Sequence, residues 1–237
     1  MNGFFITGTD TDVGKTILTA LLLAELRRRG VDVVPMKPVQ SGTEEGSADL
    51  AYSMALAGLT ASPEEQKKMV PYCFGPPCSP HLAAEMAGVE IKMKHLLQTA
   101  LDLGESHDAL LVEGAGGVLV PLNRQEKMVD LMKKLGLPVL LAARPSLGTI
   151  NHTLLSIEVL RAHQVPIAGI VFIHSTPTPA GFIEEDNANI IAHFSEVPVL
   201  GTIPYCAELQ KTPPPCYSDL PLPLLAEIEK ITENAWR

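Results

Sequence analysis

The chain has 237 residues, of which 46% are hydrophobic but only 5% aromatic, and its formal net charge is −9. An acidic chain gains nothing from counterion release on nucleic acid and is repelled by anionic membranes, so neither partner is expected. We find no apolar stretch of roughly 18 residues and no signal-peptide pattern, and we expect Cys73, Cys78, Cys206 and Cys216 to be free thiols of a cytoplasmic protein.

Short apolar runs alternate with helical patterns along the whole chain. In chain order, the pattern predicts a strand at 3–7, a helix at 14–29, a strand at 31–37, a helix at 47–58, an irregular proline-rich loop at 70–81, a helix at 91–104, a strand at 108–113, a helix at 126–135, a strand at 138–143, a helix at 149–163, a strand at 167–173, a helix at 181–194, a strand at 197–203, an irregular segment at 213–223 and a final helix. Continuously apolar strands are typical of a parallel sheet covered on both faces. We therefore expect a single doubly wound α/β domain over residues 1–237.

The first predicted strand leads into the sequence GTDTDVGKT, which is typical of a phosphate-binding loop. Backbone N–H groups of such a loop and the N-terminus of the next helix bind phosphate oxygens. We expect Lys15 to reach the β- and γ-phosphates and the Thr16 hydroxyl to bind Mg²⁺. The usual spacing needs a glycine where this chain has Thr9, so the loop is a longer variant of a P-loop NTPase-like motif.

Two acids lie inside this loop, Asp10 and Asp12. A loop that held only phosphate would avoid carboxylates, whereas a loop that also met a cationic substrate could use one. We expect Asp12 to face an acceptor that carries amines and approaches the γ-phosphate. The plainer alternative is that both acids point to solvent or cap turns, and we prefer it for Asp10.

Three more polar residues occupy positions where ligands bind in open α/β sheets. Lys37 and Glu113 each end a predicted strand, and ligands bind in the crevice at those carboxyl ends. Asp49 begins the helix that follows the Lys37 loop. Mg²⁺ bound to a nucleotide takes one or two carboxylates besides the loop hydroxyl, and Glu113 and Asp49 can supply them. The plainer alternatives are a solvated lysine at a strand end and an acid in a first helical turn.

Taken together, these segments resemble the dethiobiotin synthetase family. The matching segments are TGTDTDVGKT, MKPVQSG, SADLA, CSPHLAA, VEGAGG, LGTINH and GTIP, in family order from residue 3 to about 205. The resemblance implies a C–N-forming ligase of biotin biosynthesis with ATP as co-substrate and Mg²⁺ as cofactor. Such an enzyme carboxylates 7,8-diaminononanoate with CO₂, phosphorylates the resulting carbamate and closes the cyclic urea.

The resemblance also implies roles for individual residues. Catalytic roles fall to Lys15 and Lys37, and metal binding falls to Thr16, Asp49 and Glu113. The nucleotide site comprises Asp12, Val13, Gly14, Lys15, Thr16, Ile17, Asp49, Glu113, Gly114, Ala115, Gly116, His174, Ser175, Pro204, Tyr205 and Cys206. The substrate site comprises Thr11, Lys37 and Ser41, together with Gly148, Thr149, Ile150 and Asn151 from the neighbouring subunit of a homodimer.

The chain departs from the family pattern at two places. Family members usually carry an asparagine where this chain has His174, and its amide reads the nucleotide base. Residues 206–223 also match the pattern poorly.

Three other functions remain open at this point. A partitioning-type ATPase switch would need an extra lysine near Thr9 and Asp10 and a basic final helix, whereas AEIEKITEN is mixed and acidic. A cobyrinate-type synthetase usually carries a glutaminase domain, for which 237 residues leave no room. A nucleotide-binding fold without activity would not need Lys15, Lys37 or Glu113.

Overall fold

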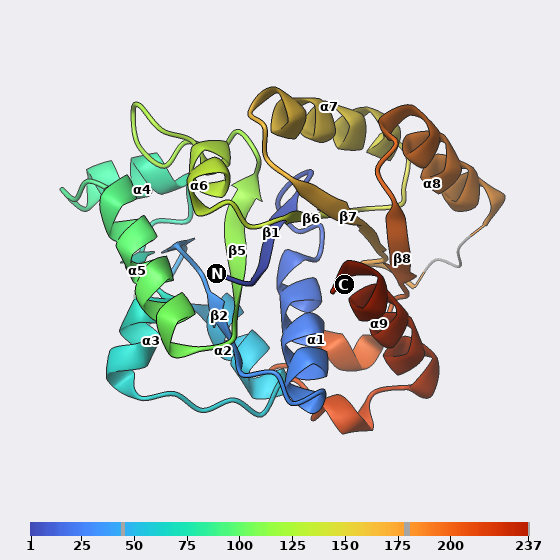
Figure 1. Ribbon diagram of the computed structural model, residues 1–237, viewed down its shortest axis with the longest axis horizontal. Helices are drawn as coiled ribbons and strands as arrows, with labels where there is room; N and C mark the ends of the chain where they lie inside the picture. Colours follow the sequence, from blue (N-terminus) through green and yellow to red (C-terminus); the bar gives the residue numbers. More distant parts are fainter. Residues whose placement is uncertain (44–45, 178–180, 237) are drawn as a thin grey trace.

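A six-stranded parallel sheet forms the centre of the molecule (Figure 1). The computed structural model describes residues 1–43, 46–177 and 181–236. The strand order is β2-β5-β1-β6-β7-β8. The chain therefore places β2 and β5 on one side of β1, and β6, β7 and β8 on the other. The strands are β1 (Gly3–Gly8), β2 (Val33–Met36), β5 (Ala109–Gly117), β6 (Val139–Ala143), β7 (Ile167–Ile173) and β8 (Val199–Ile203).

Helices cover both faces of this sheet, as the continuously apolar strands predicted (Figure 1). The helices are α1 (Lys15–Arg28), α2 (Ala48–Leu56), α3 (Pro63–Met69), α4 (Pro80–Met86), α5 (Met93–Ser106), α6 (Met128–Leu135), α7 (Thr149–Ala162), α8 (Phe182–Ser195) and α9 (Leu222–Ala235). Alternate residues of β1 show the division: Phe5 packs with α5 and α6, while Phe4 and Ile6 pack with α1 and α9. The predicted doubly wound α/β fold is confirmed.

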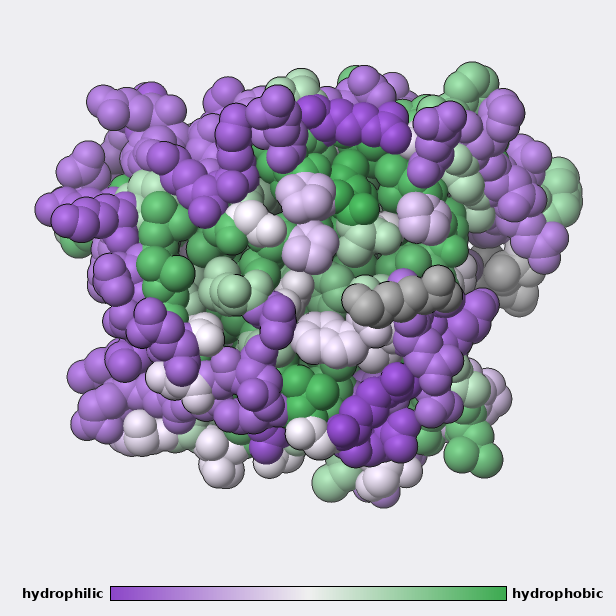
Figure 2. Space-filling view, in the orientation of Figure 1, coloured by the Kyte–Doolittle hydropathy of each residue, from purple (hydrophilic) through white to green (hydrophobic). Residues whose placement is uncertain are grey.

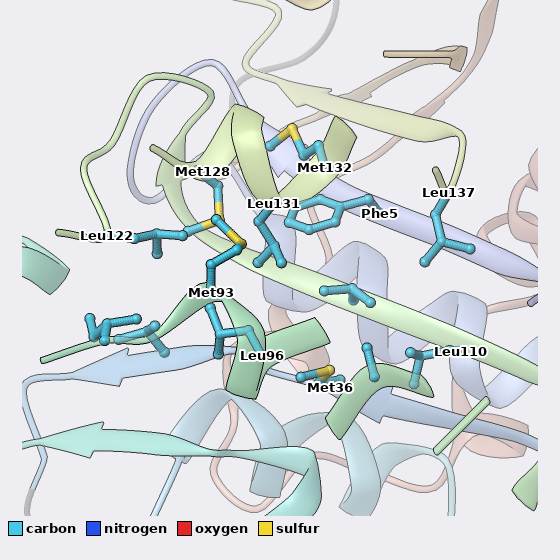
Figure 3. Close-up of a cluster of buried hydrophobic side chains, with 14 of the residues drawn as sticks. Phe5, Met36, Met93, Leu96, Leu110, Leu122, Met128, Leu131, Met132 and Leu137 are labelled. Carbon is cyan, nitrogen blue, oxygen red and sulfur yellow. The ribbon is translucent and has the colours of Figure 1, made fainter. Parts of the chain in front are cut away.

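The core compensates for its few aromatic residues with methionine and aliphatic side chains. Figure 3 shows Met93, Met128 and Met132 around the ring of Phe5, with Met36 below them and leucines from α5, α6 and β5 between. The thioether side chain is unbranched and adapts to irregular gaps, so it can fill the space that larger rings would otherwise take. On the face seen in Figure 2, hydrophobic side chains gather toward the middle and polar ones lie along the periphery.

The structure corrects the sequence prediction between residues 39 and 86. A second, two-stranded parallel sheet joins β3 (Val39–Ser41) to β4 (Tyr72–Phe74), and β4 lies inside the segment predicted as a loop. The helices α3 and α4 were also missed. Both have only seven residues, too few for a helical period to show, but each starts with a serine N-cap followed by proline in the first turn.

Two other boundaries differ from the prediction. The strand predicted at 108–113 continues as β5 through the glycine turn to Gly117, because Gly117 pairs with Gly8 of β1. The segment predicted as irregular at 213–223 contains the short 3₁₀ helix η2 (Tyr217–Asp219) and the start of α9. Among the described residues, no helix has both the length and the hydrophobicity needed to cross a bilayer.

Candidate functional site

A cavity of about 500 Å³ lies at the carboxyl ends of the central strands, beside the phosphate loop. Polar, charged and apolar residues all line this cavity. The lining residues are Thr11, Asp12, Gly14, Lys15, Thr16, Ile17, Lys37, Val39, Gln40, Ser41, Asp49, Glu113, Ala115, Gly116, Ile173, His174, Ser175, Ile203, Pro204, Cys206, Leu209 and Gln210. Most of the residues predicted for the nucleotide and substrate sites therefore meet around one cavity.

The loop between β1 and α1 has the backbone geometry of an anion site. Gly14 has φ 92° and caps the N-terminus of α1, and a Cβ at this position would lie 2.6 Å from Cγ2 of Ile173. Only glycine fits there, because both the left-handed backbone and the close approach exclude a side chain. Asp12 also has a left-handed backbone, with φ 55°. The loop thereby turns the N-terminus of α1 toward the cavity, where its unpaired N–H groups favour an anion.

Lys15 is almost completely buried at the start of α1. Its Nζ donates a hydrogen bond to the backbone oxygen of Asp10 at 2.8 Å, which folds the side chain back over the loop. Burial lowers the pKa of Lys15, and the nearby charge of Lys37 lowers it further. The ammonium group is thus costly to keep charged, and an anion in the loop would stabilise it.

The Asp10 carboxylate makes local contacts. It accepts a hydrogen bond from the backbone N–H of Thr11 at 2.7 Å and another from Arg144 Nη2 at 3.2 Å. The side chains of Asp10 and Arg144 are both largely exposed. The exposed position of Asp10 agrees with the plainer interpretation of an acid that points to solvent, whereas the contact with Arg144 was not foreseen.

Lys37, Asp49 and Glu113 form a compact charged cluster in the cavity. The Nζ of Lys37 lies 2.7 Å from Oδ2 of Asp49 and 2.7 Å from Oε1 of Glu113. The hydroxyl of Thr16 donates to the same Glu113 oxygen at 2.9 Å. Lys37 and Glu113 are almost fully buried, while the Asp49 side chain is 32% exposed. The plainer interpretation of Lys37, a solvated strand-end lysine, is wrong.

The register of the sheet explains why these groups meet. Glu113 is paired with Ile6 of β1, so it lies beside the last residues of that strand before the phosphate loop. Lys37 directly follows β2, which pairs with β5 through Met36 and Val112. Asp49 lies in the first turn of α2, whose N-cap Ser47 accepts a hydrogen bond from the N–H of Leu50. Three different elements therefore deliver the three charges to one point.

The electrostatics of this cluster keep Lys37 charged. Burial on its own lowers the pKa of Lys37, but the carboxylates of Glu113 and then Asp49 outweigh burial and raise that pKa above its ordinary value. The side chain is therefore an ammonium over the physiological pH range. Its positive charge neutralises one of the two carboxylates that face it.

The oxygen atoms gathered here are the type that Mg²⁺ prefers. Two carboxylates and one hydroxyl converge within hydrogen-bonding reach of Lys37 or of each other. The described part of the chain contains no group of three or more His, Cys, Asp or Glu that could enclose a metal by itself. Mg²⁺ in nucleotide sites needs only one or two carboxylates, since phosphates and water supply the other ligands, so these residues fit the ion.

Another part of the cavity wall is formed by residues at and just after the ends of β7 and β8. The backbone N–H of His174 donates to the oxygen of Ile203 at 3.0 Å. Within the described residues, His174 Nε2 is buried without a hydrogen-bond partner. An orphaned polar atom beside a cavity is a candidate for contact with a bound molecule.

Several predicted residues do not line the cavity. Val13, Gly114 and Tyr205 are chain neighbours of lining residues, and Val13 is buried in the core. Gly148, Thr149, Ile150 and Asn151 lie at the N-terminus of α7 and are not among the residues that line the cavity of the same chain. Gly148 has φ 93° and caps that helix. The start of α7 is thus a second helix N-terminus, separate from the phosphate loop.

Sequence reasoning missed Val39, Gln40, Ile173, Ile203, Leu209 and Gln210 among the lining residues. Ile173 and Ile203 end predicted strands, so the rule that identified Glu113 would also have found them. Leu209 and Gln210 belong to the 3₁₀ helix η1 (Ala207–Gln210), in a segment with no recognisable pattern. No signal in the sequence marks them.

Comparison with known proteins gives consistent results along most of the chain. A family model described as an AAA domain matches residues 2–212. The ATP-dependent dethiobiotin synthetase BioD of Halalkalibacterium halodurans is 41% identical over 211 residues, which cover 88% of this chain and 87% of that protein. The protein of the same name from Nitrosospira multiformis is 42% identical over 204 residues, covering 86% of this chain and 88% of that one.

Solved structures with the same architecture are more distant in sequence. The cell division ATPase MinD of Pyrococcus furiosus superimposes with a TM-score of 0.59 at 19% identity, covering 99% of this chain and 98% of that one. The MinD protein of Aquifex aeolicus gives a TM-score of 0.64 at 14% identity, covering 98% and 96%. At these identities the likeness concerns the fold alone, and it identifies a P-loop NTPase fold.

Proposed function

The chain belongs to the ATP-dependent dethiobiotin synthetase family, and from this premise we propose that it carboxylates 7,8-diaminononanoate and closes the cyclic urea of dethiobiotin. It is a ring-closing ligase that uses ATP as co-substrate. The observation that carries the proposal is the cluster of Lys37, Asp49, Glu113 and Thr16 beside the phosphate loop. This cluster supplies both a cation for a developing anion and oxygen ligands for a metal, at the place where a γ-phosphate would lie.

In this proposal the phosphate loop binds ATP. The N–H groups at the start of α1 bind phosphate oxygens, and Lys15 exchanges its bond to the Asp10 backbone for the β- and γ-phosphates. Thr16, Asp49 and Glu113 would hold Mg²⁺, which would neutralise charge on the phosphate oxygens. The base would lie beside His174, Ser175 and residues 204–206.

Lys37 acts on the transferring phosphoryl group. One amine of the diamine attacks CO₂ and loses a proton, which gives a carbamate. A carbamate oxygen then attacks the γ-phosphorus, ADP leaves, and a carbamic–phosphoric anhydride forms. Finally, the second amine attacks the carbonyl carbon, loses its proton and expels phosphate. The Lys37 ammonium would stabilise the negative charge shared by the carbamate and phosphoryl oxygens.

The diamine would lie between the phosphate loop and the β3 segment. Thr11 and Ser41 line this part of the cavity and offer hydroxyl groups, and Asp12 offers a carboxylate to an amine. The remaining substrate residues, 148–151, are not among the residues that line the cavity of the same chain. We therefore assign them to the neighbouring subunit of a homodimer, in which the N-terminus of α7 binds the carboxylate tail of the substrate.

The proposal is tested by direct detection of the product. Purified protein is incubated with diaminononanoate, ATP, Mg²⁺ and ¹³C-bicarbonate, and dethiobiotin is sought by mass spectrometry. The expected product carries the ¹³C label. A short reaction with C¹⁸O₂ should also place an ¹⁸O atom in the released phosphate, since the carbamate oxygen leaves with phosphorus. Failure to form labelled dethiobiotin would refute the function, and unlabelled phosphate with normal product would refute the anhydride.

A further inference from the structure

We propose that Lys37 is an internal cation that holds the metal carboxylates in the free protein and must leave them before a divalent ion can bind. This inference rests on the proposed function, because it takes Asp49 and Glu113 as the metal ligands. It adds a second role for Lys37: the same ammonium that acts on the phosphoryl group first occupies the place of the metal. Lys37 would thus link the arrival of the metal to the readiness of the catalytic group.

The first argument is that Lys37 has no free donor. An ammonium group has three N–H donors. In the structure they are directed to Asp49 Oδ2 at 2.7 Å, to Glu113 Oε1 at 2.7 Å and to the backbone oxygen of Gly114 at 3.5 Å. Lys37 cannot contact a carbamate or a phosphoryl oxygen without giving up at least one of these bonds. An exchange of hydrogen-bond partners must therefore precede any contact of Lys37 with the reacting groups.

The second argument is that the lysine and the metal need the same oxygen atoms. The Nζ of Lys37 lies between the two carboxylates, at hydrogen-bonding distance from both. Glu113 Oε1 also accepts the hydroxyl of Thr16, the third predicted ligand. A divalent cation bound to Asp49 and Glu113 would be within a few ångströms of the ammonium, and two desolvated cations so close repel strongly. Occupancy by one excludes the other.

The third argument comes from the balance of charge. The charged side chains that line the cavity are Asp12, Lys15, Lys37, Asp49 and Glu113, with a net charge of −1. This is a weak attraction for a free metal ion, and Lys37 already uses the two best oxygens. A nucleotide polyphosphate changes the balance, because it attracts both lysines and brings negative charge of its own. Lys37 can then exchange its carboxylates for phosphate oxygens while the metal takes its place.

The exchange predicts that loss of the Lys37 ammonium raises the metal affinity of the free protein, which a lysine that only assists catalysis does not predict. Lys37→Met removes the competing cation, so the free protein should bind Mn²⁺ more tightly in the absence of nucleotide. The expected gain is roughly 10- to 100-fold, the factor that a hydrogen bond to a charged group is typically worth. Binding is measured by electron paramagnetic resonance of free Mn²⁺, with Mg²⁺ as competitor. Turnover is expected to fall in the same variant.

A matched control is available in the same cavity. Lys15 is as deeply buried as Lys37, but its Nζ donates to the backbone of Asp10 and forms no ion pair with Asp49 or Glu113 in the described part of the chain. Lys15→Met removes an equal charge without freeing the carboxylates. Its Mn²⁺ affinity should rise by a clearly smaller factor. Equal gains in the two variants would mean that only the net charge matters, and would overturn the exchange.

Wild-type protein offers a second test that does not depend on folding of a variant. Lys37 should resist acetylation in metal-free protein, because its side chain is buried and its ammonium group is paired with two carboxylates. Mg²⁺ at a concentration that saturates the free protein, fixed by its competition with Mn²⁺, should increase this labelling, measured by peptide mass spectrometry relative to exposed lysines. Unchanged labelling, or a Lys37→Met protein that is folded but binds Mn²⁺ no more tightly than wild type, would overturn the proposal. Neither measurement uses diamine or CO₂, so either result is independent of whether dethiobiotin forms.

Discussion

Glu113→Gln should destabilise the free protein considerably more than Asp49→Asn. Removing one partner of a buried ion pair typically costs about 3–5 kcal/mol. Here Glu113 is 3% exposed, but Gln keeps an oxygen for Thr16, and Asp49 still neutralises Lys37. We therefore expect Glu113→Gln to lower the free energy of unfolding by about 2 kcal/mol. The Asp49 side chain is 32% exposed, so solvent screens its interaction with Lys37. We therefore expect Asp49→Asn to lower the free energy of unfolding by about 1 kcal/mol or less.

Urea unfolding of the metal-free wild type and both variants checks this difference. The midpoints should fall in the order wild type, Asp49→Asn, Glu113→Gln, with an unchanged dependence on urea concentration. Circular dichroism before unfolding confirms that each variant starts from the native fold. The reasoning is refuted if Glu113→Gln is as stable as wild type, or if Asp49→Asn is the less stable variant. In either case the buried carboxylate would not be the main partner of Lys37.

Four other results are expected. Lys37→Ala should reduce kcat by roughly 10²–10³-fold, as removal of one group that stabilises a transition-state anion does; near wild-type turnover contradicts that role. Asp49→Asn and Glu113→Gln should each raise the Mg²⁺ concentration for half-maximal turnover, and superimposed titrations contradict the assignment. His174 offers one donor and one acceptor on opposite sides of its ring, so wild type should prefer ATP over CTP and GTP less strongly than the His174→Asn variant does. The test compares kcat/KM for the three nucleotides in both proteins. A wild-type preference above about 10³ that the asparagine does not increase would contradict the prediction. Burial lowers the pKa of Lys15, so ATP affinity should fall as pH rises toward 10.5, and it should fall less in Lys15→Arg. The free protein should lose no stability when Lys15 is deprotonated, because burial disfavours the charged form. Parallel curves of ATP affinity against pH for the two proteins would contradict this prediction.

The main architecture was predictable because the central strands are short apolar runs and the main helices are long enough to show their period. The small β3–β4 sheet was not. Its strands have three residues each and lie more than thirty positions apart, so their pairing depends on tertiary packing rather than on local pattern. The extension of β5 through Gly117 has the same origin, since its partner is Gly8.

The site was predictable where position within the fold decides function. Lys37 and Glu113 were found because each ends a predicted strand, at the ligand-binding edge of the sheet. The contact between them, across 76 residues of sequence, could not be inferred from either segment alone. Nor could the bond from Arg144 to Asp10, for which no motif exists. The role of residues 148–151 also concerns a second subunit and stays a prediction.

Phosphate release measured with and without the diamine tests the central claim most directly. The γ-phosphoryl acceptor is a carbamate that exists only after the diamine has reacted with CO₂. We therefore expect phosphate release to be slow with ATP and Mg²⁺ alone, and to rise with diamine and bicarbonate in equal amount to the dethiobiotin formed. Fast ATP hydrolysis that neither diamine nor bicarbonate changes would contradict the ligase and favour a switch ATPase.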